Sequence, residues 1–215
     1  MWLEKCPGTT DNVIYVLAHM IEARDGTTEQ HIEQTTRYIK ILLDYMMDHG
    51  TYINEIVEWD IETAASSARL HDIGKISIPD HILNKKAKLT EDEFEIIKTH
   101  ASQGEKIIGM IMDRTDDNEF LHHARLFAGN HHERWDGKGY PRELKNLAIP
   151  LHGRIMAIVD VYDALTSVRP YKDALTHEEA MEIILNESGK QFDPKIVDIF
   201  LKIQQQLTQR SKDNV

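Results

Sequence analysis

The spacing of apolar residues along the chain is helical almost throughout. Apolar positions recur every three or four residues, which is the pattern of helices with one buried face. No segment alternates apolar and polar residues as a half-buried strand does. The pattern therefore predicts an all-α fold organised as a single helical domain.

Local signals place the ends of the predicted helices. Thr90 with Glu93, and Thr176 with Glu179, have the spacing of capping boxes. Asp193-Pro194 has the order of a cap followed by proline in the first turn, and Thr10 is the expected cap of the first helix. The helices are expected at residues 10–21, 29–49, 61–71, 90–111, 118–129, 154–165, 176 onward and 194–206. The second should turn inward Tyr38, Ile39, Leu42, Leu43 and Met46.

Length and composition fit one ordinary globular domain. The chain has 215 residues, 41% hydrophobic and 28% charged, which is enough for one sizeable core. We expect the domain over residues 11–207, with a linker or cloning remnant at 1–10 and a frayed tail at 208–215. No apolar run approaches a membrane span, and the N-terminus lacks the pattern of a secretory signal. The single cysteine, Cys6, excludes an intrachain disulfide and favours a cytoplasmic location.

The net charge of −11 narrows the class of partner. Proteins that bind duplex nucleic acid usually present excess positive charge to the phosphates, so such a partner is not expected. A small anionic ligand stays compatible, because bound cations can reverse the field locally.

The run HHERWDGKGYP at 131–141 carries the strongest chemical signal. His131, His132 and Glu133 are residue types that bind metals. The glycines and proline that follow force an irregular turn presenting Tyr140, which fits backbone lying close to a ligand. After the whole chain is considered, Glu133 is interpreted as a residue supporting a ligand rather than binding a metal itself.

A second signal is the pair His71-Asp72, which follows a helix rich in small residues. Imidazole and carboxylate side by side suit iron or manganese, although a helix end with a solvated aspartate is the ordinary interpretation of such a pair. Gly74-Lys75 raises the signal, because it ends the helix and places an ammonium near the pair.

Other candidates lie on the inward faces of predicted helices. His31 and His100 both point inward, where a hydrogen-bonded core histidine is the ordinary interpretation. Asp160 sits in a nearly all-apolar helix, and a buried carboxylate is costly unless it is paired or metal-bound. Asp163 is given a structural role, with metal binding or an arginine partner as alternatives. Ordinary surface or core roles are assigned to His19, His49, His81, His122, His123, His152 and His177.

These motifs together resemble the HD-GYP subgroup of HD-domain phosphohydrolases. The resemblance rests on HDIGK at 71–75 and HHERWDGKGYP at 131–141. It continues through RD at 24–25, His31, IPDHIL at 78–83, KTH at 98–100, RIMAIVDVYDALTSVRPYK at 154–172 and FDP at 192–194. The matching stretches follow the family's order over nearly the whole chain.

The resemblance implies an all-helical domain with a metal centre in the bundle core, holding two divalent ions, iron or manganese. Its ligands would be His31, His71, Asp72, His100, His131, His132 and Asp160. The implied activity is hydrolysis of cyclic di-GMP to linear pGpG, or onward to GMP, by a metal-bridged hydroxide, with Asp72 bridging and Lys75 offsetting phosphoryl charge. The implied substrate contacts are Asp25, Lys75, Gly139, Tyr140, Arg169 and Lys172.

Departures from the family pattern bear on the expected number of metal ions, the product and the substrate. Three-metal members carry a glutamate where this chain has Thr27, and Glu29 stands where glycine is common, so a third metal is disfavoured and pGpG is the expected product. Gln34 replaces a common arginine, and the loops at 85–89 and 142–146 lack proline and glycines usual there. Selectivity for another cyclic dinucleotide therefore stays open.

Two other functions compete with this one. The domain could hydrolyse other cyclic or linear nucleotides, or it could be a weakly active receptor that binds the dinucleotide and signals through protein contacts. A homodimer is compatible with the resemblance. Family members usually follow a receiver or other sensory domain, and nothing in this sequence resembles one, so an upstream sensory domain or a partner protein is a further expectation.

Overall fold

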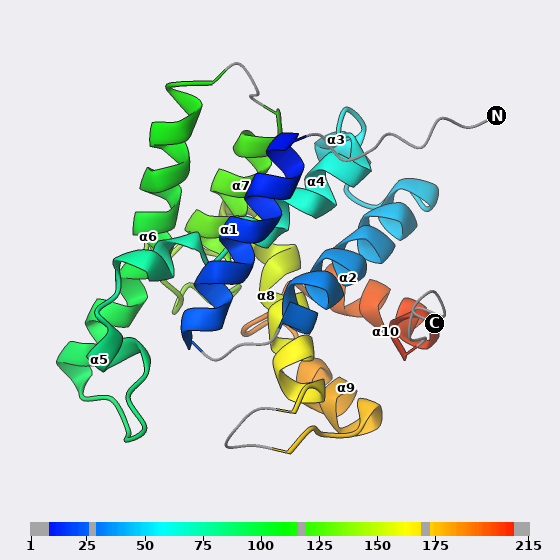
Figure 1. Ribbon diagram of the computed structural model, residues 1–215. Helices are drawn as coiled ribbons and strands as arrows, with labels where there is room; N and C mark the ends of the chain where they lie inside the picture. The colour runs from blue at the N-terminus through cyan, green and yellow to red at the C-terminus, as the bar shows by residue number, and fades with distance from the viewer. Residues whose placement is uncertain (1–8, 26–28, 116–118, 169–172, 209–215) are drawn as a thin grey trace, which may run out of the picture.

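The computed structural model describes residues 9–25, 29–115, 119–168 and 173–208. Helices are the regular elements throughout this part of the chain, and no strand occurs in it (Figure 1). The α-helices are α1 (Thr9–Asp25), α2 (Glu29–Asp48), α3 (Ile53–Ile56), α4 (Ile61–Ser67), α5 (Asp80–Leu83), α6 (Glu91–Met112), α7 (Glu119–Asn130), α8 (Leu151–Thr166), α9 (His177–Asn186) and α10 (Pro194–Thr208). Three 3-10 turns accompany them: η1 (Ala68–Leu70), η2 (Ile73–Ser77) and η3 (Asn146–Ala148). The predicted all-α fold is confirmed.

The predicted helix starts agree well with the structure. Both capping boxes form, because Thr90 and Thr176 each accept the backbone N–H of the glutamate three residues on. The Lys195 N–H donates to Asp193 at 2.9 Å, directly before the proline-initiated α10. Thr10 lies inside α1, which already includes Thr9, so its predicted role as a cap is wrong.

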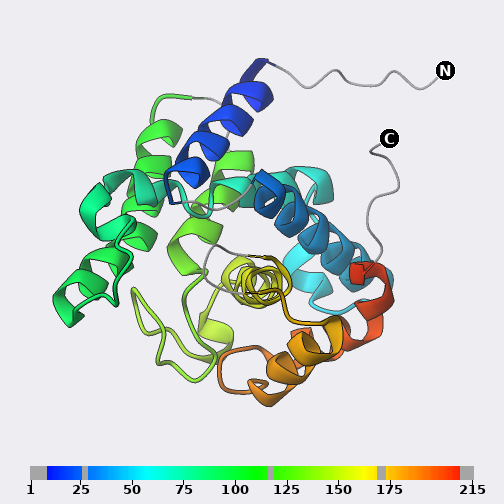
Figure 2. The ribbon, with the colours of Figure 1, turned by 60° about the horizontal axis from the view of Figure 1, so that its bottom comes forward.

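Helix α8 forms the centre of the bundle. It is the most continuously apolar helix, and its residues from Leu151 to Val159 are all buried. Figure 2 shows α8 end-on, with other helices arranged around it. It contacts α2, α7, α9 and α10. A side chain on α8 can therefore reach the interior of the whole domain.

Two apolar clusters make up the core. The larger joins residues of α2, α4, α8, α9 and α10, including all five residues predicted to face inward on α2. The smaller joins α1, α6 and α7 to the turns around residue 70. Helices α2 and α7 contribute to both clusters; α2 carries His31 of the predicted site, and His131 and His132 directly follow α7.

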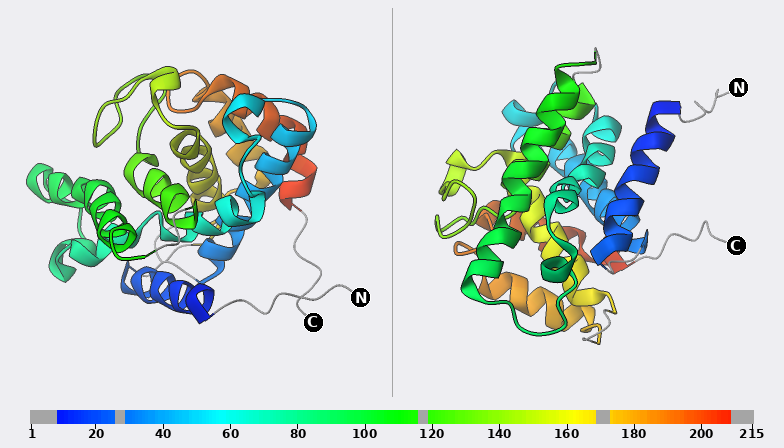
Figure 3. Two further views of the ribbon diagram at one scale, coloured as in Figure 1. Left: turned by 90° about the horizontal axis from the view of Figure 1, so that it is seen from above. Right: turned by 60° about the vertical axis from the view of Figure 1, so that its left-hand side comes forward.

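Helix α1 lies at the edge of the bundle (Figure 3). It packs against α2, η1 and η2. Arg24 ties its end to the segment after the His71-Asp72 pair, donating to the carbonyls of Lys75, Ile76 and Ile78 and to Asp80. Among the described residues, no helix is both long enough and apolar enough to cross a membrane.

Candidate metal centre

The His71-Asp72 pair is placed by small residues on both sides. Helix α4 is capped by Asp60, whose side chain accepts the Thr63 N–H, and it buries Ala64 and Ala65. The 3-10 turn η1 follows α4 directly, and His71 comes next, in the interior. Gly74 then rests against α6, where an added Cβ would lie 1.9 Å from the His100 carbonyl oxygen. Only glycine allows this approach, so Gly74 brings the pair against the helix that carries His100.

Asp72 lies between two groups of histidines. Its Oδ2 atom is 3.2 Å from His71 Nε2 and 2.7 Å from the Lys75 ammonium. Its Oδ1 atom is 3.3 Å from His100 Nε2 and 3.5 Å from His131 Nε2. A carboxylate facing ligands through both oxygens has the arrangement of a bridge. Lys75 is near the pair, as the sequence predicted.

His100 and His131 present their Nε2 atoms to each other at 3.1 Å. The Nδ1 atom of His100 is 2.7 Å from the Ile97 carbonyl, and that of His131 is 3.0 Å from the Ala128 carbonyl. A carbonyl only accepts, so each Nδ1 carries the proton and each neutral ring has its lone pair on Nε2.

Three acceptor atoms therefore converge: Asp72 Oδ1, His100 Nε2 and His131 Nε2, which we call the acceptor triangle. Their separations of 3.1, 3.3 and 3.5 Å are repulsive for lone pairs with no hydrogen between them. Adjacent ligands of an ion with bonds of about 2.1 Å lie roughly 3 Å apart when bond angles are near 90°. The acceptor triangle thus fits a cation.

His132 extends the triangle toward the surface. Its ligating nitrogen lies within 4.8 Å of those of His100 and His131. Burial, together with neighbouring His131, holds the pKa of His132 well below its usual value, and burial lowers the pKa of His131. Both rings are therefore neutral at pH 7, which is the form that binds metals.

The second group contains His31 and His71. The His31 Nδ1 atom is 2.6 Å from Asp163 Oδ2, and its Nε2 atom is 3.8 Å from Asp160 Oδ1. Asp163 therefore orients a histidine, in line with its structural role, and the alternative of an arginine partner stays a prediction. Asp160 keeps a 27% exposed side chain facing the site. Its role as a ligand stays a prediction.

Neighbouring opposite charges shift the pKa values of Asp72 and His71. Burial would raise the pKa of Asp72, but the Lys75 ammonium and His71 hold it well below its usual value. Burial would lower the pKa of His71, but Asp72 raises it to about 9. A metal binding at His71 Nε2 must therefore displace a proton, so binding should release protons.

Glu22 is a residue of the site that sequence reasoning missed. It lies on α1, is 2% exposed, and both its oxygens are buried without a hydrogen-bond partner among the described residues. Its ligating oxygen lies within 4.8 Å of nitrogens of His31 and His71. Burial, reinforced by the Asp72 charge, raises the pKa of Glu22. The available signal was its helical spacing from the buried Ala18 and Ile21.

The glycine turn at 137–141 folds back on its own chain. A Cβ at Gly139 would lie 2.3 Å from the Arg134 nitrogen and 2.5 Å from the His132 carbonyl oxygen. The Tyr140 N–H donates to that carbonyl at 3.1 Å, and the Tyr140 ring stacks on the His132 ring. Gly139 is thus required by the turn itself. Tyr140 stands over a predicted ligand.

Among the described residues, Glu133 bonds to its own loop and not to a predicted ligand. Its buried carboxylate accepts the backbone N–H groups of Arg142 at 2.8 Å and Leu144 at 2.9 Å. The Arg142 guanidinium also binds Glu105, the Gly129 carbonyl and Asn130. Glu133 therefore fixes the loop that follows the glycine turn.

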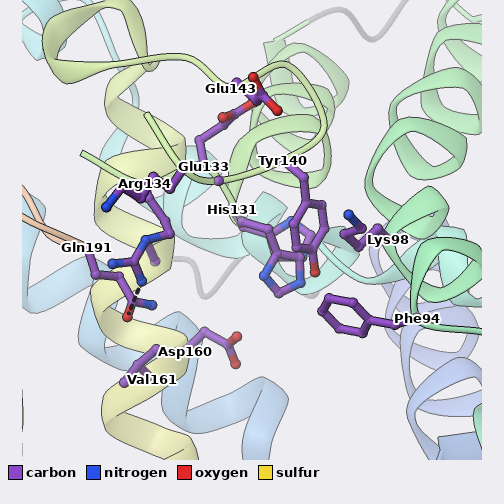
Figure 4. A pocket seen from close by; sticks show the side chains of 14 residues that line it. Phe94, Lys98, His131, Glu133, Arg134, Tyr140, Glu143, Asp160, Val161 and Gln191 are labelled. Atoms are coloured by element: carbon purple, nitrogen blue, oxygen red, sulfur yellow. Dashed lines mark hydrogen bonds between the residues drawn. The ribbon is translucent and has the colours of Figure 1, made fainter. Parts of the chain in front are cut away.

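A cavity of about 530 Å³ opens beside the histidines, within the usual size range of small-molecule sites. Figure 4 shows Asp160 on one side, with Phe94 and Lys98 facing it from the other. The Lys98 ammonium lies 5.5 Å from the Phe94 ring centre and 5.8 Å from that of Tyr140. Sequence reasoning missed Phe94 and Lys98, although their spacing of four residues put them on one face of α6.

The described residues do not cover every predicted contact. Thr27, Arg169 and Lys172 lie outside them, as do the side chains of Asp25 and Glu29. The seven predicted metal ligands all fall inside. His31, His71, Asp72, His100, His131, His132 and Asp160 come from α2, the turns after α4, α6, the end of α7 and α8, and the structure brings them to one place.

Comparison with known proteins gives matches over nearly the whole chain. A family model described as HD domain matches residues 28–196. A cyclic di-GMP phosphodiesterase of Vibrio cholerae is 42% identical over 197 residues, which are 92% of this chain and 40% of that protein. One of Thermotoga maritima is 39% identical over 94% of this chain and 52% of its own length. A 3'3'-cGAMP-specific phosphodiesterase of V. cholerae is 35% identical over 90% of this chain and 35% of its own.

A solved structure supports the fold. The crystal structure of a cyclic GMP-AMP specific phosphodiesterase from V. cholerae matches 91% of this chain and 48% of its own, with a TM-score of 0.61 and 19% identity. At that identity the likeness speaks for the fold alone. The chain spans about half the length, or less, of the relatives it matches.

Proposed function

Because this chain belongs to the HD domain family, with motifs of the HD-GYP subgroup, we propose that it is a metal-dependent phosphodiesterase. Its proposed reaction is hydrolysis of cyclic di-GMP to linear pGpG. The names of relatives at 39–42% identity support this substrate.

The acceptor triangle is the observation that carries the proposal. Nε2 of His100, Nε2 of His131 and Oδ1 of Asp72 face one another at 3.1–3.5 Å, an arrangement that a bound cation would satisfy. One ion would be held by the triangle and His132. A second would be held by His31, His71 and Asp160, with Asp72 shared. Mixed imidazole and carboxylate ligands suit iron or manganese.

Each of these residues has a separate role in the proposed reaction. When bound, two divalent ions lower the pKa of a water molecule and neutralise phosphodiester charge. Asp72, which Lys75 keeps ionised, would be the ligand shared by the two ions. Asp163 holds His31 with Nε2 toward the site. Lys75 also places positive charge where the phosphoryl oxygens gain charge in the transition state.

The cavity supplies the proposed substrate contacts. Asp25, Lys75, Gly139, Tyr140, Arg169 and Lys172 are proposed from their motif positions. We add Phe94 and Lys98, which line the cavity opposite Asp160. Phe94 is 47% exposed, although it is a large apolar residue, and its ring offers a surface on which a guanine can stack.

A product assay tests the proposal. Protein loaded with Mn²⁺, or with Fe²⁺ under anaerobic conditions, is incubated with cyclic di-GMP and the products are separated by chromatography. We expect pGpG from the unaltered protein, no product from His100→Ala, and full activity from His122→Ala. His122 is a matched control because it is exposed on α7, outside the site. Intact cyclic di-GMP after incubation with metal-loaded protein would contradict the proposal.

Parallel reactions decide between substrates. The cGAMP-specific relative makes 3'3'-cGAMP the natural competitor. We expect cyclic di-GMP to give the higher kcat/KM, because the more similar relatives carry that name. Preference for a mononucleotide would favour a general phosphohydrolase. Tight binding with negligible turnover would favour a receptor.

The proposal also covers the cellular location of the protein, its control and its assembly. A cytoplasmic location is supported by the single cysteine. Control by a sensory domain or partner protein, and assembly as a homodimer, stay predictions from the family resemblance.

A further inference from the structure

We propose that Glu22 is a metal ligand, completing with His31 and His71 the coordination of one ion of the centre. This inference rests on the proposed metal centre and adds a ligand from α1 that no motif of the resemblance includes.

Glu22 is buried in a way that needs an explanation. Its side chain is 2% exposed, and neither oxygen has a hydrogen-bond partner among the described residues. A buried carboxylate without partners is costly, and such groups in proteins are usually paired or coordinate metals. Glu133, which is equally buried, obeys this rule through two backbone N–H groups.

The neighbours of Glu22 are metal-binding groups. Its oxygen and the ligating nitrogens of His31 and His71 all lie within 4.8 Å of one another. The Nδ1 atoms of both histidines are engaged, at 2.6 Å from Asp163 and 2.9 Å from the Ala68 carbonyl. Both rings therefore turn Nε2 toward the site. His71 Nε2 also lacks a hydrogen-bond partner among the described residues. Two imidazoles and a carboxylate form a sound ligand set for a divalent ion.

The surrounding structure fixes Glu22 in this position. Ala18 and Ile21 bury the same face of α1 in the smaller core cluster. Arg24, one half-turn further, binds the backbone of residues 75–78. Helix α1 is thereby held against the segment that carries His71 and Asp72, and Glu22 is its only acidic side chain described as buried.

Titration of Mn²⁺ into chelator-treated protein tests the inference. We expect unaltered protein to bind two ions tightly, and Glu22→Gln to retain one and bind the other at least about ten-fold more weakly. Glu22→Asp keeps the carboxylate and should keep both ions, with intermediate affinity for one. Asp193→Asn is the matched control, because it removes an equally buried carboxylate outside the centre and should leave both affinities unchanged.

Thermal unfolding separates a ligand from a structural residue. Glu22→Gln removes a buried carboxylate that has no hydrogen-bond partner among the described residues, so its melting temperature without metal should equal or exceed that of unaltered protein. The increase caused by Mn²⁺ should be smaller. Unchanged ion affinities in Glu22→Gln would overturn the inference, as would a lower melting temperature without metal together with an unchanged Mn²⁺ increment.

The outcomes are independent of the proposed reaction. If unaltered protein hydrolyses cyclic di-GMP while Glu22→Gln binds both ions normally, only the inference about Glu22 fails. If unaltered protein binds two ions through Glu22 but hydrolyses no cyclic dinucleotide, only the proposed function fails.

Discussion

Hydrogen bonds to the far side of each imidazole decide what the histidines of the centre can do. The Nδ1 atoms of His71, His100 and His131 hydrogen-bond to backbone carbonyls, and that of His31 bonds to a carboxylate. Each ring is left with Nε2 facing inward. Such outer partners fix the ring and increase its basicity as a ligand. The accepting backbone carbonyls cannot be removed by a side-chain mutation, but the Asp163 carboxylate can.

Asp163→Asn should weaken metal binding. The amide can still accept the His31 N–H, but it lacks the charge that makes the ring a stronger ligand. Titration of Mn²⁺ should show affinity about 10–100-fold lower for one ion. Asp198→Asn, an exposed position on α10, is the control. Equal affinities for the unaltered protein and Asp163→Asn would show that this carboxylate has no part in the centre.

A second histidine pair should make stability depend on pH. His123 Nδ1 lies 2.7 Å from His152 Nε2, with both rings packed on Trp59 and Glu119 3.9 Å from His123. Burial lowers the pKa of His123 and holds that of His152 well below its usual value. The folded pKa values lie below the unfolded value of 6.5, so the unfolded chain binds more protons as pH falls. The contribution is full above pH 6.5 and is lost below it.

His152→Gln removes one of these titrations while keeping a hydrogen-bonding side chain. Between pH 7.5 and 5.5, the unfolding free energy of the unaltered protein should fall by about 1 kcal/mol more than that of the variant. Chemical denaturation at the two pH values measures the difference, and the metal-site histidines cancel in the comparison. Parallel losses in both proteins would mean that folding does not lower the pKa of His152.

At the scale of elements, one glycine joins two halves of the site. Gly74 allows η2 to rest on the α6 backbone, so that His71 and Asp72 meet His100. No other residue fits, because a Cβ would meet backbone atoms that cannot rotate away. The close approach of η2 and α6 is therefore a condition for forming the acceptor triangle.

Gly74→Ala should disrupt both stability and metal binding. The new Cβ would lie 1.9 Å from the His100 oxygen and 2.5 Å from the Gly104 nitrogen, so α6 and η2 must separate. We expect a loss of about 3 kcal/mol in urea unfolding, with weaker Mn²⁺ binding. Gly109→Ala is the control on α6, since its Cβ meets nothing within 4 Å, and should gain up to about 1 kcal/mol. Similar stabilities for the two variants would contradict this account.

Helix positions were predictable because their signals are local. Capping boxes at Thr90 and Thr176 and the apolar face of α2 depend on residues within a few positions of each other. The partners of inward polar groups were not predictable in the same way. Asp163 meets His31, which is 132 residues away, and periodicity says only that both are buried. Glu22 was missed for the same reason, because periodicity places it on the inward face of its helix but does not identify the residues it contacts.

At the scale of the whole molecule, a buried ion pair joins segments far apart in the sequence. Arg154 on α8 lies 3.0 Å from Asp193 before α10 and 2.8 Å from Glu55 on α3. The Tyr52 hydroxyl donates to the same Asp193 oxygen at 2.6 Å. Local sequence patterns do not predict this network, because Arg154 is 39 residues from Asp193 and 99 residues from Glu55.

Asp193→Ala should cost about 3–5 kcal/mol of unfolding free energy, because it leaves the Arg154 charge buried without its main partner. The loss should be the same with Mn²⁺ and with chelator, since the network contains none of the proposed ligands. Asp198→Ala, exposed on α10, should change little. Denaturant unfolding of the three proteins gives the comparison, and a cost below about 1 kcal/mol for Asp193→Ala would show that Arg154 finds another partner.

The most direct test of the central claim is the rate of cyclic di-GMP hydrolysis as a function of bound Mn²⁺ per chain. The convergence of Asp72, His100 and His131 requires that the chelated protein be inactive. We predict that linear pGpG appears only as ions bind, and that the rate saturates when two ions are bound per chain. An equal rate in chelated protein, or no hydrolysis with two ions bound, would contradict the account.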